Sequence, residues 1–355
     1  MVAVVVCCML IEGLCSVGLL VYDMVIYSQP ALAERQHTEF HEQIGWINVP
    51  DRVVPEMYGP GRTVTINGQG YRNREEFDIE VPPGKLRVVC SGDSFTFGYG
   101  VGDEDTWCSV LQQRHPRVEV VNMGQGGYGF DQVYLWYLLD QQEKSLQHQI
   151  HLFCIGPNQI VRMRHDRFVG YGKPILKMQA DRVVADRVPV PKRAFYIPWL
   201  TRNVDLVKSS RTVQLFSRMT SCESSKDKDA SLLSVDEAVQ ITVAALGQLA
   251  VEHRARKRQL VVVWLPDPAE YRPTMMDPLR SSILRDLQAA GVPTIDLVQE
   301  LRKIPETPMR KLFIQPGELD YVGAAGHYTE EGNRFFAEKL QVILRQSPQW
   351  GDWWE

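Results

Sequence analysis

Residues 87–100 read RVVCSGDSFTFGYG, an apolar run that breaks into Gly-Asp-Ser and then into small and aromatic residues. The run is typical of a buried strand, and Ser94 follows it almost at once. Two interpretations are open at this point. The turn presents Ser94 as a nucleophile at the end of the strand, or Gly92, Asp93 and Ser94 only cap the start of a helix. The rest of the chain has to distinguish them.

The strand-like pattern recurs along the chain and predicts a parallel sheet. Runs rich in Val, Ile and Leu occupy residues 86–92, 118–124, 150–156, 259–267 and 292–297. Helix-like stretches fall between or after them, at 104–114, 130–147, 235–256, 277–290 and 329–345. Near-continuous apolar strands that alternate with amphipathic helices indicate an α/β fold whose sheet is covered on both faces.

Composition narrows the class of protein. The 355 residues include 39 basic and 43 acidic side chains, which gives a net charge of −4 and makes nucleic acid an unexpected partner. The seven cysteines show neither CxxC nor zinc-type spacing. We therefore expect no metal and no cofactor.

The first segment of the chain is apolar enough to cross a membrane. Residues 2–22, VAVVVCCMLIEGLCSVGLLVY, carry a single charge at Glu12, and about 20 apolar residues span a bilayer. We predict that residues 1–27 form an uncleaved membrane anchor. The alternative is a signal peptide, for which Ala31-x-Ala33 offers a cleavage pattern. The first basic residue is Arg35, which argues weakly for a cytoplasmic C-terminal side.

The remainder divides into two predicted parts. Residues 28–85 are interpreted as a polar neck with short strands, and residues 86–346 as the α/β domain. Residues 160–233 interrupt the strand–helix alternation and are predicted to be an insertion over the site, with a short hairpin inside it. Three aromatic side chains of the insertion are candidate stacking surfaces for a substrate: Tyr171, Tyr196 and Trp199.

Functional residue types gather where the strands end. The first strand reaches Ser94, the second reaches NMGQGGYGFDQ (122–132), and the third reaches GPNQ (156–159). His327 stands just before the last helix. Ligands of such sheets bind at the carboxyl ends of the strands. A serine, a histidine, an amide and backbone-exposing glycines at one edge are the groups that acyl transfer needs.

These four blocks resemble those of the SGNH (GDSL-type) hydrolases. GDSFTFG matches the first block, NMGQGGYG the second, GPNQ the third and GHYTEEG the fourth, and the resemblance covers residues 65–345. It implies a flavodoxin-like, three-layer α/β/α sandwich. It also implies that Ser94 is the nucleophile and His327 the base, with Gly127 and Asn158 supplying oxyanion donors beside the Ser94 N–H.

The activity that the resemblance implies is that of a serine esterase. Such an enzyme hydrolyses or transfers a small acyl group through an acyl-serine intermediate, and an O-acetylated carbohydrate is the expected substrate. Bacterial relatives of this kind are anchored or exported, so we expect a single-pass protein of the inner membrane with an extracytoplasmic catalytic domain.

Two departures from the family pattern bear on activity. Gln159 stands where the third block usually has Asp, and Ala324 and Ala325 occupy the positions of the acid that normally precedes the histidine. Asp320 is one candidate for that acid, ahead of Glu318 and Glu330. A backbone carbonyl could orient the histidine instead. The third alternative is a membrane-tethered carbohydrate-binding protein that has lost the reaction.

Two rival sites have less support in the sequence. Gly124-x-Gly126-x-x-Gly129 fits a dinucleotide fingerprint, but the following strand ends without the acid that would hold a ribose. The G-x-S-x-G elbow of the α/β-hydrolases is absent, because Thr96 follows Ser94 where the second glycine belongs.

Overall fold

The computed structural model describes residues 2–26, 36–168, 171–191, 211–212, 215, 231–321, 323–348 and 351–354. Its centre is a sheet of five parallel strands in the order β13-β12-β7-β5-β6. The strands are β5 (Leu86–Gly92), β6 (Val118–Gly124), β7 (Ile150–Ile155), β12 (Gln259–Trp264) and β13 (Thr294–Asp296). If the five strands are numbered in chain order and read from the β6 edge, their order is 2-1-3-4-5, as in flavodoxin-like folds. The switch point of this order lies between β5 and β7.

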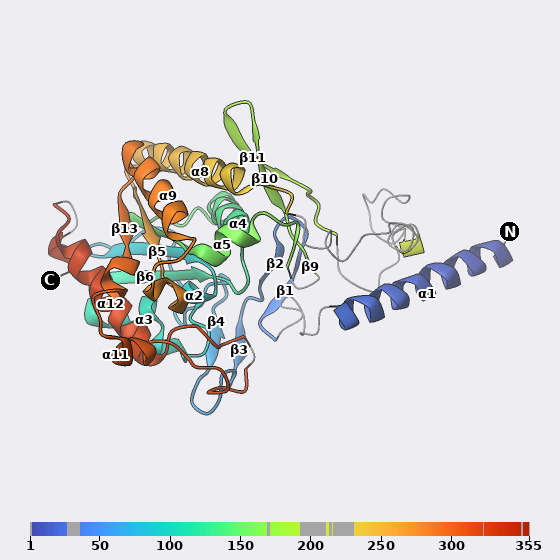
Figure 1. Cartoon of the computed structure of the whole chain (residues 1–355), viewed down its shortest axis with the longest axis horizontal. Helices are drawn as coiled ribbons and strands as arrows, with labels where there is room; N and C mark the ends of the chain where they lie inside the picture. The colour runs from blue at the N-terminus through green and yellow to red at the C-terminus, as the bar shows by residue number, and fades with distance from the viewer. Residues whose placement is uncertain are drawn as a thin grey trace.

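Helices cover both faces of this sheet, as the sequence predicts. Alternate residues of each strand point to opposite faces. Val89, Phe153 and Val262 join the core under one set of helices, whereas Val88, Leu152 and Val263 join the core under the other. The first set is α4 (Phe130–Glu143), α8 (Val235–Ala255) and α9 (Asp277–Ala289); the second is α3 (Trp107–Arg114), α10 (Leu297–Leu301) and α12 (Glu330–Arg345). Figure 1 shows the resulting three layers.

The segment predicted to be a neck is built into the main core. It forms two antiparallel pairs: β1 (Thr38–His41) with β2 (Gly45–Asn48), and β3 (Arg52–Val54) with β4 (Val64–Ile66). Trp46 and Tyr71 are fully buried in the larger core cluster. The Trp46 indole N–H donates to the Gly126 carbonyl at 2.9 Å. This segment is therefore part of the α/β core and contacts the segment that carries Gly127.

The start of the insertion contains a helix and two small antiparallel pairs. Helix α5 (Pro157–Arg162) is followed by β8 (Arg167–Phe168), which pairs with β9 (Tyr171–Gly172). The predicted hairpin is present as β10 (Ile175–Gln179) and β11 (Arg182–Asp186), and it projects from the body of the molecule in Figure 1. Tyr196 and Trp199 lie outside the described residues.

Helix α1 (Val2–Ile26) extends away from the body of the molecule (Figure 1). Its window Val2–Leu19 has a mean hydropathy of 2.4 and is 11% buried, so by length and composition the helix is a candidate membrane span. A signal sequence near the N-terminus has the same properties.

The remaining elements are short. They are α2 (Ser94–Phe97), α11 (Glu306–Arg310), and the 3₁₀ turns η2 (Asp103–Asp105), η5 (Pro268–Tyr271) and η6 (Gly351–Trp353). Of these, α2 carries the serine on which the site is built.

Candidate active site

Ser94 is the first residue of α2, directly beyond the end of β5. Asp93 caps this helix, because its carboxylate accepts the Phe95 N–H at 3.1 Å. Gly98 ends it after one turn with a φ of 88°. The turn is closely packed: a Cβ at Gly92 would collide with the Thr96 side chain, and one at Gly124 with the Phe97 backbone. Small residues at these positions therefore let the chain turn sharply and present Ser94.

The structure brings Ser94 and His327 together. His327 Nε2 lies 2.7 Å from Ser94 Oγ although 233 positions separate the two residues. The segment that carries His327 is held by two backbone bonds, from Ile314 N–H to the His327 carbonyl and from Gly326 N–H to the Ile314 carbonyl, both at 2.8 Å. The helix-cap interpretation holds for Asp93, which is the cap, whereas the Ser94 hydroxyl faces His327.

A backbone carbonyl orients His327. Its Nδ1 lies 3.2 Å from the Ala324 carbonyl. A carbonyl can only accept, so Nδ1 carries the proton and Nε2 is left as the acceptor that faces the Ser94 hydroxyl. This tautomer is assigned from the hydrogen-bond partners. It is the one a general base requires.

The structure does not bring Asp320 to the histidine. Asp320 is exposed, and among the described residues its carboxylate has no hydrogen bond to His327. The loop turns at Tyr321, whose carbonyl accepts the Ala324 N–H at 2.9 Å. That turn places the Ala324 carbonyl where a triad acid would lie. Within the described part of the chain, the geometry is that of a Ser–His dyad.

His327 is neutral at neutral pH. Burial, together with the positive charge of Arg162, lowers its pKa to about 4, although the bond to the Ala324 carbonyl acts in the opposite direction. Its ring packs against Phe95 and Tyr99, with centroids 4.6 and 5.3 Å away. A neutral imidazole aimed at a hydroxyl can take up the proton of Ser94.

The two predicted oxyanion residues lie at the same edge of the sheet. Gly127 follows β6 and has a φ of 75°, a backbone conformation that glycine adopts without strain. Asn158 is in the first turn of α5, just beyond β7, and is half-buried. The described part of the chain gives its side-chain amide no hydrogen-bond partner. Gly127 thus lies beyond β6 and Asn158 beyond β7, the two strands that flank β5.

Three further residues support this edge, and the sequence alone did not single them out for it. Asn122 accepts the Gly124 N–H at 2.9 Å and donates to the Thr96 carbonyl at 3.0 Å, so it ties the second block to the first. Arg72 donates to the carbonyls of the turn after α2. Arg162 binds Asp93. The only signal for the arginines is that both stand inside or next to recognised blocks, INGQGYRN and GPNQ.

Tyr171 does not serve as a stacking surface in this structure. Its side chain is 3% exposed and packs edge-on against Trp46, with ring centroids 6.3 Å apart. An aromatic ring that is closed off by the core cannot stack on a sugar. Any stacking surface on Tyr196 or Trp199 lies outside the described residues.

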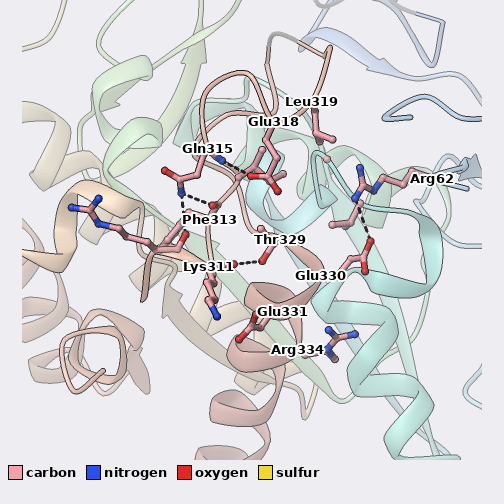
Figure 2. A pocket seen from close by; sticks show the side chains of 14 residues that line it. Arg62, Lys311, Phe313, Gln315, Glu318, Leu319, Thr329, Glu330, Glu331 and Arg334 are labelled. Carbon is pink, nitrogen blue, oxygen red and sulfur yellow. Dashed lines mark hydrogen bonds and ion pairs between the residues drawn. The ribbon is translucent and has the colours of Figure 1, made fainter. Parts of the chain in front are cut away.

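A cavity of about 670 Å³ lies beside the segment that carries His327 (Figure 2). The cavity is polar, because cationic side chains and three glutamates line it. Arg62 forms an ion pair with Glu330 at 3.5 Å. None of Ser94, Gly127, Asn158 and His327 lines it. The cavity is therefore separate from the reacting groups. Among the described residues, no cluster of three His, Cys, Asp or Glu side chains is arranged to hold a metal ion.

Comparisons with known proteins return similar structures only. No family model and no curated protein matches the sequence. Solved structures to which the chain is similar include a putative lipolytic protein of the G-D-S-L family from Desulfitobacterium hafniense, with 13% identity and a TM-score of 0.40 over 73% of this chain and all of that one. An acetyl xylan esterase, AlAXEase, gives 14% identity and a TM-score of 0.42 over 73% of this chain and all of that one.

A third similar structure is a catalytic mutant of Axe2, an acetylxylan esterase from Geobacillus stearothermophilus. It has 12% identity and a TM-score of 0.37 over 74% of this chain and 95% of that one. Similarity at this level assigns no activity. With four sequence blocks converging on one edge of a 2-1-3-4-5 sheet, the chain has the fold of the SGNH (GDSL-type) hydrolases.

Proposed function

We propose that the protein is a serine esterase that works through an acyl-Ser94 intermediate. The observation that carries the proposal is the 2.7 Å contact between Ser94 Oγ and the unprotonated Nε2 of His327. In the first step Ser94 Oγ attacks the ester carbonyl carbon and its proton passes to His327 Nε2. The C–O bond to the alcohol then breaks, and the alcohol leaves with that proton.

The second step reverses these roles. His327 takes a proton from water, the resulting hydroxide attacks the acyl carbon, and Ser94 leaves with the proton as the acid is released. The Ser94 N–H, the Gly127 N–H and the Asn158 amide would stabilise the oxyanion in both steps. A sugar hydroxyl in place of water would give acyl transfer by the same chemistry.

The Ala324 carbonyl performs part of the work of a triad acid. It fixes the tautomer of His327, but as a neutral dipole it stabilises the imidazolium less than a carboxylate does. A dyad of this kind is expected to turn over more slowly than a full triad.

We further propose a short acyl group, such as O-acetyl on a carbohydrate, as the substrate. The burial of Ser94, whose exposure is 2%, supports a small acyl chain. The acetyl xylan esterases among the similar structures are consistent with this choice. We also propose that α1 anchors the enzyme in a bacterial inner membrane with the catalytic domain extracytoplasmic. Protease that digests the domain in spheroplasts supports this location, whereas protection until lysis contradicts it.

Activity-based labelling tests the central proposal. A fluorophosphonate probe is expected to label the wild-type protein and to leave Ser94→Ala unlabelled. Among p-nitrophenyl esters, the acetate is expected to be hydrolysed fastest and the octanoate slowest. Among the described residues no carboxylate bonds His327, which favours a second candidate, a tethered binding protein without activity. Folded wild-type protein that neither labels nor hydrolyses p-nitrophenyl acetate would establish that candidate instead.

A further inference from the structure

Arg162 contacts every segment that carries an expected oxyanion donor. It stands on α5 four positions after Asn158, so the two side chains lie on the same face of that helix. Its Nη1 donates to the Asp93 carboxylate and to the Tyr128 carbonyl, both at 3.2 Å. Asp93 directly precedes Ser94, and Tyr128 directly follows Gly127.

The contact with Asp93 is an ion pair sheltered from solvent. The side chains of Arg162 and Asp93 are 18% and 4% exposed. The other oxygen of Asp93 caps α2, so one carboxylate connects the guanidinium to the turn that presents Ser94. The Arg162 guanidinium also lies over the Phe168 ring, 4.8 Å from the ring centroid, and this contact restricts the orientation of the guanidinium plane.

We propose that Arg162 is a positioning residue that sets the geometry of the oxyanion hole by joining α5, the Ser94 turn and the Gly127 turn. The inference rests on the esterase function proposed above. Three donors on three separate segments stabilise one oxygen atom only if the segments keep a fixed spacing. A displacement of about 1 Å at such a site can cost ~100-fold in rate.

Arg162 also has an electrostatic effect that packing alone would not produce. Its positive charge opposes protonation of His327 and so lowers the pKa of that base. The other groups against His327 are the Ser94 hydroxyl and the rings of Phe95 and Tyr99, and Arg162 is the charged side chain that shifts its pKa. Removing the guanidinium charge should therefore raise the pKa of His327 and move the acid limb of kcat/KM to higher pH.

The test compares Arg162→Met with Arg164→Met in the full chain. Arg164 is a matched control, because it lies two residues away and donates instead to Leu233 O and Ser231 Oγ at 2.9 and 2.7 Å. With p-nitrophenyl acetate, Arg162→Met should lower kcat by ~10- to 100-fold with KM within about twofold of wild type. Its acid limb should shift to higher pH. Arg164→Met should keep the wild-type kcat and pH profile.

A double variant adds a second readout. Arg162→Met combined with Asn158→Ala should lose less activity than the product of the two single losses, because both act through the same hole. Arg162→Lys keeps the charge on a shorter side chain that cannot reach both acceptors of Nη1, so it should keep the acid limb and still lose kcat. If Arg162→Met does not fold, the lysine variant decides, and wild-type kcat there overturns the inference.

Failure of this inference differs from failure of the esterase proposal. A folded Arg162→Met variant with wild-type kcat and an unmoved acid limb overturns the role of Arg162 alone. Wild-type protein that is neither labelled at Ser94 nor active overturns both.

Discussion

At the scale of single residues, the distinctive feature is that a main-chain carbonyl holds His327, the proposed base. The sequence predicted Ser94 and His327, and it showed that the usual acid positions hold alanine. It could not decide between Asp320 and a carbonyl, because that depends on the path of a loop with two glycines. The turn that directs the Ala324 carbonyl at Nδ1 is visible only in the structure.

Asp320→Asn is therefore expected to be nearly silent. Its carboxylate is exposed and does not contact His327, so kcat with p-nitrophenyl acetate should stay within about twofold of wild type. A triad acid would instead cost up to ~10,000-fold. His327→Ala is the matching positive control and should abolish turnover. A large loss in Asp320→Asn would restore the triad interpretation.

Asn158→Ala should lower kcat by ~100- to 1,000-fold with little change in KM, as expected when one preorganised donor is lost. Asn158→Asp keeps the shape and removes the N–H donor, so it should be at least as impaired. Steady-state kinetics on both variants make the measurement. Unchanged turnover would show that GPNQ is only a loop.

The low pKa of His327 sets the pH dependence of the reaction. Because burial holds it near 4, the base stays neutral well below pH 7. We expect kcat/KM to be flat from neutral pH down to about 5 and to fall with an apparent pKa of about 4. A fall centred near 6.5 would mean that the base is solvated as an ordinary histidine.

At the scale of elements, the turn after α2 depends on Arg72. This buried side chain donates to the carbonyls of Phe97, Gly98 and Val101, the last at 2.7 Å, and its guanidinium lies over the Phe97 ring. Valine-rich runs made β5 and β6 predictable to the residue. Helix α5 was missed although Pro157 at its first position is a recognised start signal. The role of Arg72 could not be predicted, because its hydrogen-bond acceptors are distant in the sequence and leave no local sequence pattern.

Arg72→Met should destabilise the protein, because buried carbonyls that lose their donor cost ~1 to 3 kcal/mol each. We expect the free energy of unfolding in urea to fall by at least ~3 kcal/mol. Arg74→Met is the control, since the Arg74 side chain is 52% exposed and its shortest ion pair, at 2.7 Å, is with the exposed Glu104. Equal stability of the two variants would contradict the role given to Arg72.

At the scale of the whole molecule, a cluster of histidines buried between β7 and α8 makes stability depend on pH. Tyr137 bonds His148 and His253, each at 3.1 Å, and His151 bonds Ser91 at 2.7 Å. Burial lowers the pKa of all three histidines, that of His253 to about 4.

The unfolded chain therefore binds more protons than the native one between pH 6.5 and about 4, so the stability these neutral histidines contribute falls as the pH falls. Glu270, whose pKa burial raises to about 7, acts in the opposite sense. The comparison that isolates the cluster is His253→Gln. Between pH 6 and 4.5, wild type should lose up to ~1.4 kcal/mol per pH unit more than this variant. If the unfolding free energies of wild type and His253→Gln change with pH in parallel, the role of the histidine cluster is contradicted.

The neck and the helix α1 should respond oppositely to truncation. Deleting residues 1–35 should leave kcat within about twofold and move the protein from the membrane fraction to the soluble one, since the apolar window of α1 is only 11% buried. Deleting residues 1–85 should abolish folding, because Trp46 and Arg72 are lost with it. A folded, active product of the longer deletion would show that the neck is a separate unit.

That integration of the neck limits how far the proposed enzyme can reach from the membrane. Its first strand begins at Thr38, and described structure resumes at residue 36, ten residues after α1 ends at Ile26. Ten residues span at most about 35 Å when fully extended. With α1 in a bilayer, as proposed, this tether keeps the catalytic domain, and Ser94 with it, close to the membrane surface. Its ester substrates must therefore be made near the membrane surface, or be delivered to it, within the reach of the tether.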